Sequence, residues 1–328
     1  MPPPNSESPV FIMPHFRPDG MCSTFLPRTI ESLLQQTDEA WRLIIINDGC
    51  TNGFCTSLFR TLSEEHPERI SILTQSQHSG TGHARNVGVK NAASTGAPFV
   101  MFQDDDDLAH PRRVEITRRI FNEKPDVGYI YSHFIPIDHN DSVVPRELIR
   151  LDMLEVLEAL EEEIVEGDDA WLKIATSTGF VGTTSTVSVR TTLALAVPFP
   201  EEVFSEDSHA WLRMSALGAR FAYAPDIPTR YRMEGGVCSD LGFNGRNSGT
   251  LKLKARIDID GFNQAVTLAL ERGKISPGDV RELAISFYRR LARTVERQGH
   301  VRLGQLLRRH SDSIGDDNAL APLSLAEL

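Results

Sequence analysis

Four consecutive carboxylates follow an apolar run near residue 100. The run Phe99–Phe102 predicts a fully buried strand, and Asp104–Asp107 begin one residue after Gln103. Adjacent carboxylates repel one another, so such a cluster usually needs a cation. A hard divalent ion such as Mg²⁺ takes oxygen ligands and binds through one or two carboxylates together with substrate phosphates. The cluster therefore indicates a divalent-metal site, although a solvated acidic loop or the start of a helix near Pro111 would also place acids here.

Two other predicted strands also end in polar or aromatic side chains. His15 and Phe16 follow Val10–Met13, and Asp48 follows Leu43–Ile46 after one residue. In open α/β sheets, ligands bind beyond the carboxyl ends of the strands. We therefore expect these side chains and the acidic cluster to meet at one crevice.

Strands and helices are expected to alternate through the first hundred residues. Continuous apolar runs predict strands at 10–13, 43–46, 70–73 and 99–102, and amphipathic segments predict helices at about 27–36, 54–65 and 83–93. Strands that are apolar throughout and alternate with helices are typical of βαβ units in a mostly parallel sheet. The predicted fold class is α/β.

Composition narrows the class of protein. The chain has 328 residues, and its 40% hydrophobic content is enough for a sizeable core. Its net charge of −11 argues against a nucleic-acid-binding surface that extends over the whole protein. No apolar run approaches the ~20 residues of a membrane helix. Residues 1–8 resemble a loose tail rather than a signal peptide. The four cysteines, Cys22, Cys50, Cys55 and Cys238, show no metal-ligand spacing, so we expect incidental thiols in a reducing, cytoplasmic setting.

Four short motifs follow one another along the chain. They are Ile12–Phe16 (a strand, Pro and an aromatic turn), Ile45–Thr51 (like Asp-Asp-Gly-Ser-Thr, with Asn47 and Cys50 as departures), Ala84–Gly88 (like Ala-Arg-Asn-x-Gly) and Phe102–Asp107 (D-x-D-D). Their order resembles the inverting family 2 glycosyltransferases, which bind nucleotide sugars on a GT-A fold. The resemblance covers roughly residues 9–235 and implies a mostly parallel sheet flanked by helices, with a C-terminal helical appendage outside it.

The resemblance implies roles for individual residues. Asp48 would accept a hydrogen bond from the imide N–H of uracil or thymine, and Phe16 would pack on that ring. Asp104 and Asp105 would belong to the donor-binding set, with Asp104 facing the ribose and the metal. Asp106 would bind Mn²⁺ or Mg²⁺. The implied co-substrate is a nucleotide-diphosphate sugar.

Each of these residues also has a purely structural interpretation. Phe16 could be a core aromatic at a strand end, and Asp48 could form an Asx turn with Gly49 while still binding a ligand. Arg85 could approach the diphosphate or pair with one of the carboxylates. The loop Ser79–Gly82 precedes a helix and suits an anion, but it lacks the Rossmann and P-loop patterns.

A second informative stretch begins at Ser205. Ser205 suits a helix N-cap, and Glu206 and Asp207 would lie in the first turn, where the helix dipole favours negative charge. With Arg213, the stretch matches the family's Glu-Asp-x-x-x-x-x-Arg segment, whose Asp is the catalytic base, so Asp207 is the predicted general base. Alternatively, both acids merely complement the helix dipole. His209 is expected to lie on the surface.

Tyr231–Glu234 matches the family's Tyr-Arg-x-His ending, with Glu234 where a histidine often stands. Glu234 could be a second metal ligand, or the position could bind nothing. Upstream, Leu151–Ile164 predicts an acidic amphipathic helix with a solvated face, and Ala175–Val189 is expected to be strand and loop on the acceptor side.

The chain is predicted to be helical from about residue 250. Arginines such as Arg289, Arg293 and Arg297 flank apolar residues at helical spacing. This basic amphipathic pattern could pack on the catalytic domain, mediate a homodimer or contact an anionic membrane surface. Intramolecular packing is the default interpretation.

We therefore predict an inverting glycosyltransferase that uses a UDP- or dTDP-linked donor and an acceptor hydroxyl on a small molecule, a lipid-linked glycan or a polysaccharide. The alternatives are a sugar-phosphate nucleotidyltransferase and a noncatalytic nucleotide-sugar-binding scaffold. The predicted divisions are a disordered tail (1–8), a catalytic domain (9–249) with a nucleotide-sugar half (9–107) and an acceptor half (108–249), a helical extension (250–314) and a flexible tail (315–328).

Overall fold

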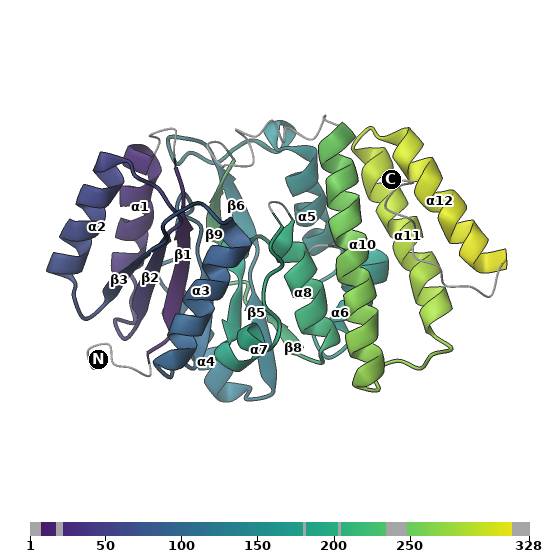
Figure 1. The fold of residues 1–328 in the computed structure, drawn as a ribbon, viewed down its shortest axis with the longest axis horizontal. Coiled ribbons are helices and arrows are strands. Elements are labelled where there is room, and N and C mark those ends of the chain that lie inside the picture. Colours follow the sequence, from purple (N-terminus) through teal and green to yellow (C-terminus); the bar gives the residue numbers. More distant parts are fainter. Residues whose placement is uncertain (1–7, 18–21, 180–181, 203–204, 234–247, 317–328) are drawn as a thin grey trace. The chain divides into compact units, whose positions relative to one another are not determined.

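The computed structural model describes residues 8–17, 22–179, 182–202, 205–233 and 248–316. The chain forms two compact units (Figure 1). We call Met1–Leu148, Gly182–Val203 and Ala222–Val237 the sheet unit, and Ile149–Val181, Phe204–Phe221 and Cys238–Leu328 the helical unit.

The main sheet of the described residues has seven strands in the order β3-β2-β1-β4-β7-β5-β8. β1 is parallel to both β2 and β4, and β2 is parallel to β3, whereas β7 runs antiparallel to β4 and β5. The predicted mostly parallel α/β sheet is confirmed. The strands are β1 (Val10–His15), β2 (Arg42–Asn47), β3 (Ile70–Thr74), β4 (Phe99–Phe102), β5 (Val127–Tyr131), β7 (Ser188–Arg190) and β8 (Arg220–Tyr223).

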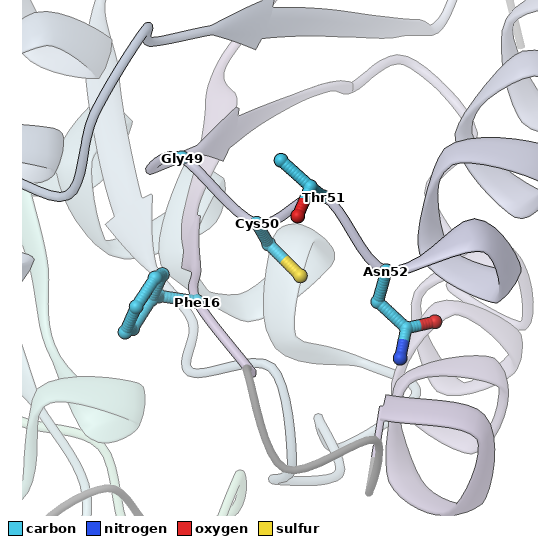
Figure 2. A pocket seen from close by; sticks show the side chains of 5 residues that line it. All are labelled: Phe16, Gly49, Cys50, Thr51 and Asn52. Carbon is cyan, nitrogen blue, oxygen red and sulfur yellow. The ribbon is translucent and has the colours of Figure 1, made fainter.

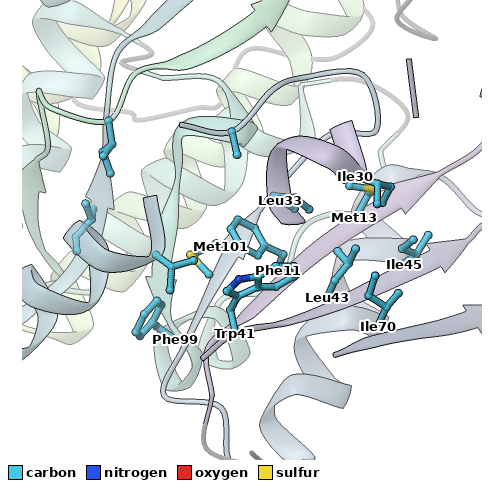
Figure 3. Packing of buried hydrophobic residues seen from close by; sticks show 14 of the residues in the cluster. Phe11, Met13, Ile30, Leu33, Trp41, Leu43, Ile45, Ile70, Phe99 and Met101 are labelled. Atoms are coloured by element: carbon cyan, nitrogen blue, oxygen red, sulfur yellow. The ribbon is translucent and has the colours of Figure 1, made fainter. Parts of the chain in front are cut away.

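The central strands are apolar because both faces of the sheet are covered. Every residue of β1 and β4 is buried. Phe11 and Met101 belong to the core cluster shown in Figure 3, where Trp41 packs edge-on against Phe11 with ring centroids 5.5 Å apart. On helix α3 (Thr81–Ser94), a Cβ at Gly88 would lie 2.5 Å from Cγ2 of Ile12, so glycine permits the close approach of this helix to β1.

In the part of the sheet unit that the structure describes, four further helices are present: α1 (Cys22–Leu34), α2 (Gly53–Glu65), α4 (Arg113–Glu123) and α7 (Thr191–Ala196). A separate parallel pair joins β6 (Phe134–Ile137) to β9 (Thr229–Arg232), and η1 (Arg146–Leu148) and η3 (Thr184–Thr186) are short 3₁₀ turns. The predicted start of the first helix at Pro27 is wrong. The helix begins at Cys22 and tolerates Pro27 inside it, at the expense of one main-chain hydrogen bond.

The helical unit contains more of the chain than its predicted C-terminal extension. Helix α8 (Glu206–Ala216) packs against α10 (Ser248–Glu271) and α6 (Ala170–Lys173), so the predicted acceptor half of 108–249 is divided between the two compact units. The other elements are α5 (Leu151–Glu162), a π-helical turn η2 (Ile174–Thr178), α11 (Val280–Arg297) and α12 (Val301–Asp316). Among the described residues of the range Ala175–Val189, which was expected to be strand and loop, the π-helical turn and η3 precede the strand β7.

Within the helical unit, the C-terminal end of α11 contacts the acidic helix α5. Arg297 forms an ion pair with Glu158, and Gln298 donates to Glu155 at 2.9 Å. Part of the acidic face that was predicted to be solvated is therefore an intramolecular contact, in keeping with the default interpretation of the basic helices. Among the helices that the structure describes, none is both long enough and apolar enough to cross a membrane.

Candidate functional site

The carboxyl ends of β1, β2 and β4 meet at one edge of the sheet, as predicted. These strands are neighbours and run parallel. The main-chain N–H of Gln103 donates to Ile12 O at 3.0 Å, and that of Asp48 donates to His15 O at 2.9 Å. This register brings His15, Asp48 and the acidic cluster to the same edge, all within the sheet unit.

Asp105 is held by the last residue of β1, His15, and by Arg17, two residues further along the chain. Its carboxylate lies 2.6 Å from His15 Nδ1 and accepts from Arg17 Nη2 at 2.9 Å. Burial alone would raise the pKa of Asp105, but Arg17 and His15 lower it to about 2. The same contact raises the pKa of His15 although burial opposes it. Asp105 is therefore a firmly ionised anchor between β1 and β4.

Asp106 shares Arg17 but has the opposite electrostatic balance. Its Oδ2 lies 2.5 Å from Arg17 Nη2. Burial and the charges of Asp105 and Asp104 raise the pKa of Asp106 to about 6, although Arg17 acts in the other direction. Arg17 thus supplies positive charge to both Asp105 and Asp106.

Asp107 is the innermost acid of the cluster and is fully buried. Its Oδ1 accepts from the main-chain N–H of Arg232 at 2.8 Å, whereas none of the described residues donates to its Oδ2. Burial, followed by the neighbouring carboxylates, raises its pKa well above the ordinary value. Behind the cluster lies the buried guanidinium of Arg113, which donates to Gln103 Oε1 at 2.9 Å. Burial lowers the pKa of Arg113 to about 9.

Asp104 is the most exposed acid of the four, with 28% of its side chain accessible. It pairs with Arg85 Nη2 at 2.9 Å, and its main-chain N–H donates to Ser185 Oγ at 2.9 Å. Arg85 comes from the first turns of α3, where its guanidinium also lies 5.4 Å from the ring centroid of Phe199. The structure thus shows the carboxylate pairing, which was one of the two alternatives for Arg85.

Asp48 lies buried at the end of β2 and is surrounded by the loop that precedes α3. Its two oxygens accept from the main-chain N–H groups of Ser79 and Gly80, each at 2.9 Å. His78 Nδ1 lies 2.8 Å from the same carboxylate. Gly49 has φ 82°, and a Cβ there would lie 2.6 Å from the main-chain N of His78, so glycine lets the loop close over this strand end.

Phe16 stacks on His78, with ring centroids 3.8 Å apart and an interplanar angle of 16°. The imidazole therefore makes both contacts predicted for a nucleobase, one with Asp48 and one with Phe16. Phe16 also lines a pocket of about 190 Å³, together with the loop Gly49–Asn52 (Figure 2). Sequence reasoning missed His78 because nothing in its spacing relates it to Phe16.

Asp207 lies in the first turn of α8, in the helical unit. Ser205 precedes this helix as predicted, but its φ is 56° and its side chain makes no capping hydrogen bond. Instead, Ser205 Oγ lies 2.7 Å from Ser208 Oγ, and Asp207 Oδ1 accepts from the main-chain N–H of Ser208 at 2.7 Å. Glu234 lies outside the described residues. The roles of Asp207 and Glu234 stay predictions.

His209 corrects another expectation. It is 2% exposed rather than on the surface, and its Nε2 lies 2.9 Å from Asp260 Oδ2. A Cβ at Gly261 would lie 3.0 Å from the His209 ring, so this glycine leaves room for the buried imidazole between α8 and α10.

The sequence interpretation also missed the basic residues that hold the acids. Arg17 and Arg232 come from separate segments, and only the sheet topology brings them to the end of β4. Four adjacent acids in the sequence predict that positive charges lie nearby. The sequence does not show which arginines supply these charges.

The sheet and its acidic strand end define a GT-A fold, the type found in nucleotide-diphospho-sugar transferases. The chain is similar to a structure of TarS residues 1–349 from S. aureus, with a TM-score of 0.52 and 17% sequence identity. The similarity covers 94% of this chain and 87% of the TarS chain. It is also similar over 93% of its length to 89% of the mannosyltransferase PcManGT from Pyrobaculum calidifontis, with a TM-score of 0.51 and 16% identity.

A sequence match identifies the family of the chain within this fold. Residues 11–186 match glycosyl transferase family 2, and this is more than half of the chain, which therefore belongs to that family. An uncharacterized glycosyltransferase from Nostoc is 31% identical over 147 residues, which cover 45% of this chain and 43% of the relative. One from Acanthamoeba polyphaga mimivirus is 26% identical over 159 residues, covering 43% and 62%. The chain thus spans less than two thirds of the length of these relatives.

Proposed function

We propose that the protein transfers a sugar from a nucleotide-diphosphate donor to an acceptor hydroxyl with inversion at the anomeric carbon. The observation that carries this proposal is the meeting of Asp48 and the acidic cluster at the carboxyl edge of β1, β2 and β4. Ligands bind at this edge of open α/β sheets. The segment that matches glycosyl transferase family 2 includes all of these residues.

The acidic cluster fits a hard divalent cation, Mn²⁺ or Mg²⁺. Its donors are carboxylate oxygens, and Asp107 Oδ2 is a buried oxygen to which none of the described residues donates. Asp104 and Asp106 would hold the ion, with Glu234 as a further proposed ligand. A bound cation supplies charge stabilisation for the departing diphosphate.

Arginine side chains would adjust to such an ion. Arg17 now donates to Asp106 and Arg85 to Asp104, so each guanidinium occupies an oxygen that a cation would use. Arg17 keeps Asp105 as a second partner when Asp106 turns to the metal. Arg85 would then be available to a diphosphate oxygen, which joins the two roles considered for this residue.

The donor is proposed to carry uracil or thymine. A carboxylate can accept about four hydrogen bonds, so Asp48 retains capacity for an imide N–H beside its two main-chain donors. Phe16 would stack on the base after His78 withdraws from its ring. Solved neighbours support the donor class in general terms: a TarS structure holds UDP, and the Pyrobaculum mannosyltransferase holds GDP-mannose with Mn²⁺.

Asp207 is proposed as the general base. The acceptor oxygen would form a bond to the anomeric carbon as the bond from that carbon to the diphosphate oxygen breaks, and the hydroxyl proton would pass to the Asp207 carboxylate. The charge left on the nucleoside diphosphate is the charge that the cation site is placed to offset. A positioned carboxylate of this kind typically contributes about 10²–10⁴-fold to the rate.

The test is nucleotide binding by calorimetry and thermal shift, with UDP, dTDP and GDP, each with and without Mn²⁺. UDP or dTDP should bind more tightly with Mn²⁺, and Asp106→Asn should remove this metal-dependent gain. The matched control is Asp226→Asn, an exposed acid of the same unit, which should behave like the wild type. Equal metal-dependent affinity in the Asp106 variant would contradict the proposed metal role of Asp106. Preference for GDP would contradict the proposal that the donor carries uracil or thymine.

A further inference from the structure

A second cluster of ligand atoms lies beside the acidic cluster and has no part in the proposed transfer reaction. His15 ends β1, Cys50 lies in the loop after β2, and Cys55 lies in the first turn of α2. One ring nitrogen and the two sulfurs lie within 4.8 Å of one another. The three side chains are almost completely buried, at 1%, 4% and 0% exposure respectively.

His15 has the orientation that metal-binding histidines usually show. Its Nδ1 lies 2.6 Å from Asp105 Oδ2, and none of the described residues makes a hydrogen bond to its buried Nε2. Histidine ligands almost always give their second nitrogen to a carboxylate, a carbonyl or water, which fixes the tautomer and directs the free nitrogen to the metal. Asp105 thus prepares Nε2 as a ligand atom.

Cys50 is fixed at its position by Asn47. The Asn47 side chain donates to Cys50 O at 3.0 Å and accepts from Cys50 N at 2.9 Å. An aspartate at position 47, as in the resembling motif, could only accept, so the two departures from that motif support each other. The Cys50 thiol donates to Arg17 O at 3.6 Å.

One member of this cluster, Cys50, borders the pocket described above. Cys50 lines that pocket with Phe16 and Asn52, and Figure 2 shows its sulfur between them. A three-ligand site needs a fourth ligand, which can be water. The pocket of about 190 Å³ has room for it.

We propose that His15, Cys50 and Cys55 bind a Zn²⁺-class cation, with Asp105 as the residue that orients His15. Two sulfurs and one imidazole select zinc over Mg²⁺ or Mn²⁺, which prefer oxygen ligands. Binding replaces the two thiol protons, which pass to the buffer, and the two thiolates neutralise the ion. No electron is transferred. This site is separate from the hard-cation site at Asp104 and Asp106 and does not depend on the proposed function.

The test uses Co²⁺ as a spectroscopic substitute for zinc. Full-length protein would be stripped with a chelator, kept reduced with a phosphine and titrated with Co²⁺ without nucleotide. We expect a sulfur-to-cobalt charge-transfer band that saturates at one equivalent and disappears when Zn²⁺ is added. Cobalt on the carboxylates produces no such band, so this result is independent of the acidic cluster. Absence of the band in the wild type overturns the proposal.

Variants assign the band to its residues. Cys50→Ser and Cys55→Ser should each remove about half of the charge-transfer intensity, and the double variant should remove all of it. Thr51→Ala, which changes the exposed neighbour of Cys50 in the same pocket, should leave the band and the zinc affinity unchanged. A full-intensity band in the double variant would mean that other thiols bind the metal, which also overturns the proposal.

A final measurement does not depend on the folding of any cysteine variant. One equivalent of Zn²⁺ should raise the melting temperature of the stripped wild type, because an ion that binds only the native state stabilises it. Asp105→Asn should weaken zinc binding about 10- to 100-fold, the usual effect of removing a carboxylate behind a histidine ligand. No change in melting temperature at saturating Zn²⁺ would contradict a site built from native-state geometry.

Discussion

The two acidic stretches of this protein, Asp104–Asp107 and Glu206–Asp207, are positioned in different ways. The first follows a buried strand, and its partners Arg17, Arg85 and Arg232 come from distant segments. The second occupies the first turn of a helix, where Asp207 accepts from the next main-chain N–H along the chain. One acidic site is thus built by sheet topology and the other by local helix geometry.

This difference shows what each site can tolerate. At the end of β4 the same residue type has opposite pKa shifts, since Asp105 falls to about 2 and Asp106 rises to about 6. A change of one partner there alters the whole cluster. At α8 the main-chain dipole favours negative charge in the first turn, so part of the stabilisation of these acids does not depend on distant side chains.

The largest expected effect is on catalysis, at Asp207. If Asp207 is the base, Asp207→Asn should lower turnover by about 10²–10⁴-fold, measured as nucleotide release from the donor that the binding screen identifies. Nucleotide affinity should stay near normal. Glu206→Gln removes the neighbouring charge from the same turn and is the control. Equal losses in both variants would mean that the acids serve only the helix dipole.

The next effect is on stability and compares the two stretches directly. Asp105→Asn leaves the buried Arg17 and His15 without their shared carboxylate, and breaking such a buried pair costs about 3–5 kcal/mol in the free energy of unfolding. Glu206 is itself 8% exposed in the first turn of α8, where glutamine keeps the shape of the side chain, so Glu206→Gln should cost less than Asp105→Asn. Urea unfolding of both variants checks this, and similar losses would remove the distinction between the two sites.

A smaller effect is expected at the base-recognition residues. Phe16→Ala should weaken uridine-nucleotide binding by about 1–3 kcal/mol, the usual contribution of base–aromatic stacking. His78→Ala should tighten binding, because the imidazole now covers Phe16 and contacts Asp48. His83→Ala, a similarly exposed histidine on α3, is the control. Weaker binding by the His78 variant would show that the imidazole assists the base instead of competing with it.

The smallest expected effect is on the pH dependence of stability, and it concerns His209 in α8. Burial lowers the pKa of His209 below its ordinary value of 6.5, although Asp260 and Asp258 act against this and Arg213 adds to it. The unfolded chain therefore binds the proton first, and His209 contributes stability above pH 6.5 that is lost as the pH falls through its lowered value. His209→Gln should flatten this acid slope in urea titrations between pH 7.5 and 5. An unchanged slope would assign it to other groups.

Sequence patterns were sufficient for the order of the elements and for the edge where the polar side chains gather. Apolar runs predicted β1, β2, β3 and β4, and parallel pairing placed Asp48 near the acidic cluster. Periodicity carries no information about long-range partners, so the pairing of Arg17 with Asp106 across 89 positions could not be predicted. The placement of α8 in the helical unit depends on packing against α10 and is likewise invisible in local pattern.

The cysteines show the same limit of prediction from sequence. Cys50 and Cys55 show no metal-ligand spacing, and the sequence therefore predicted incidental thiols. Strand pairing between β1 and β2 brings His15 to them, and Asp105 arrives with β4. Only three-dimensional adjacency makes these four residues a candidate site.

The hydrogen bond from Arg232 to Asp107 has a consequence for biosynthesis. Its two partners are 125 positions apart, so at about 5–20 residues per second the ribosome adds Arg232 roughly 6–25 s after Asp107. A nascent chain that has not reached β9 must keep this carboxylate in water or leave it without its main-chain donor. Final closure of the β4 edge therefore waits for translation of β9, and chains that end before residue 232 should expose this edge to proteases.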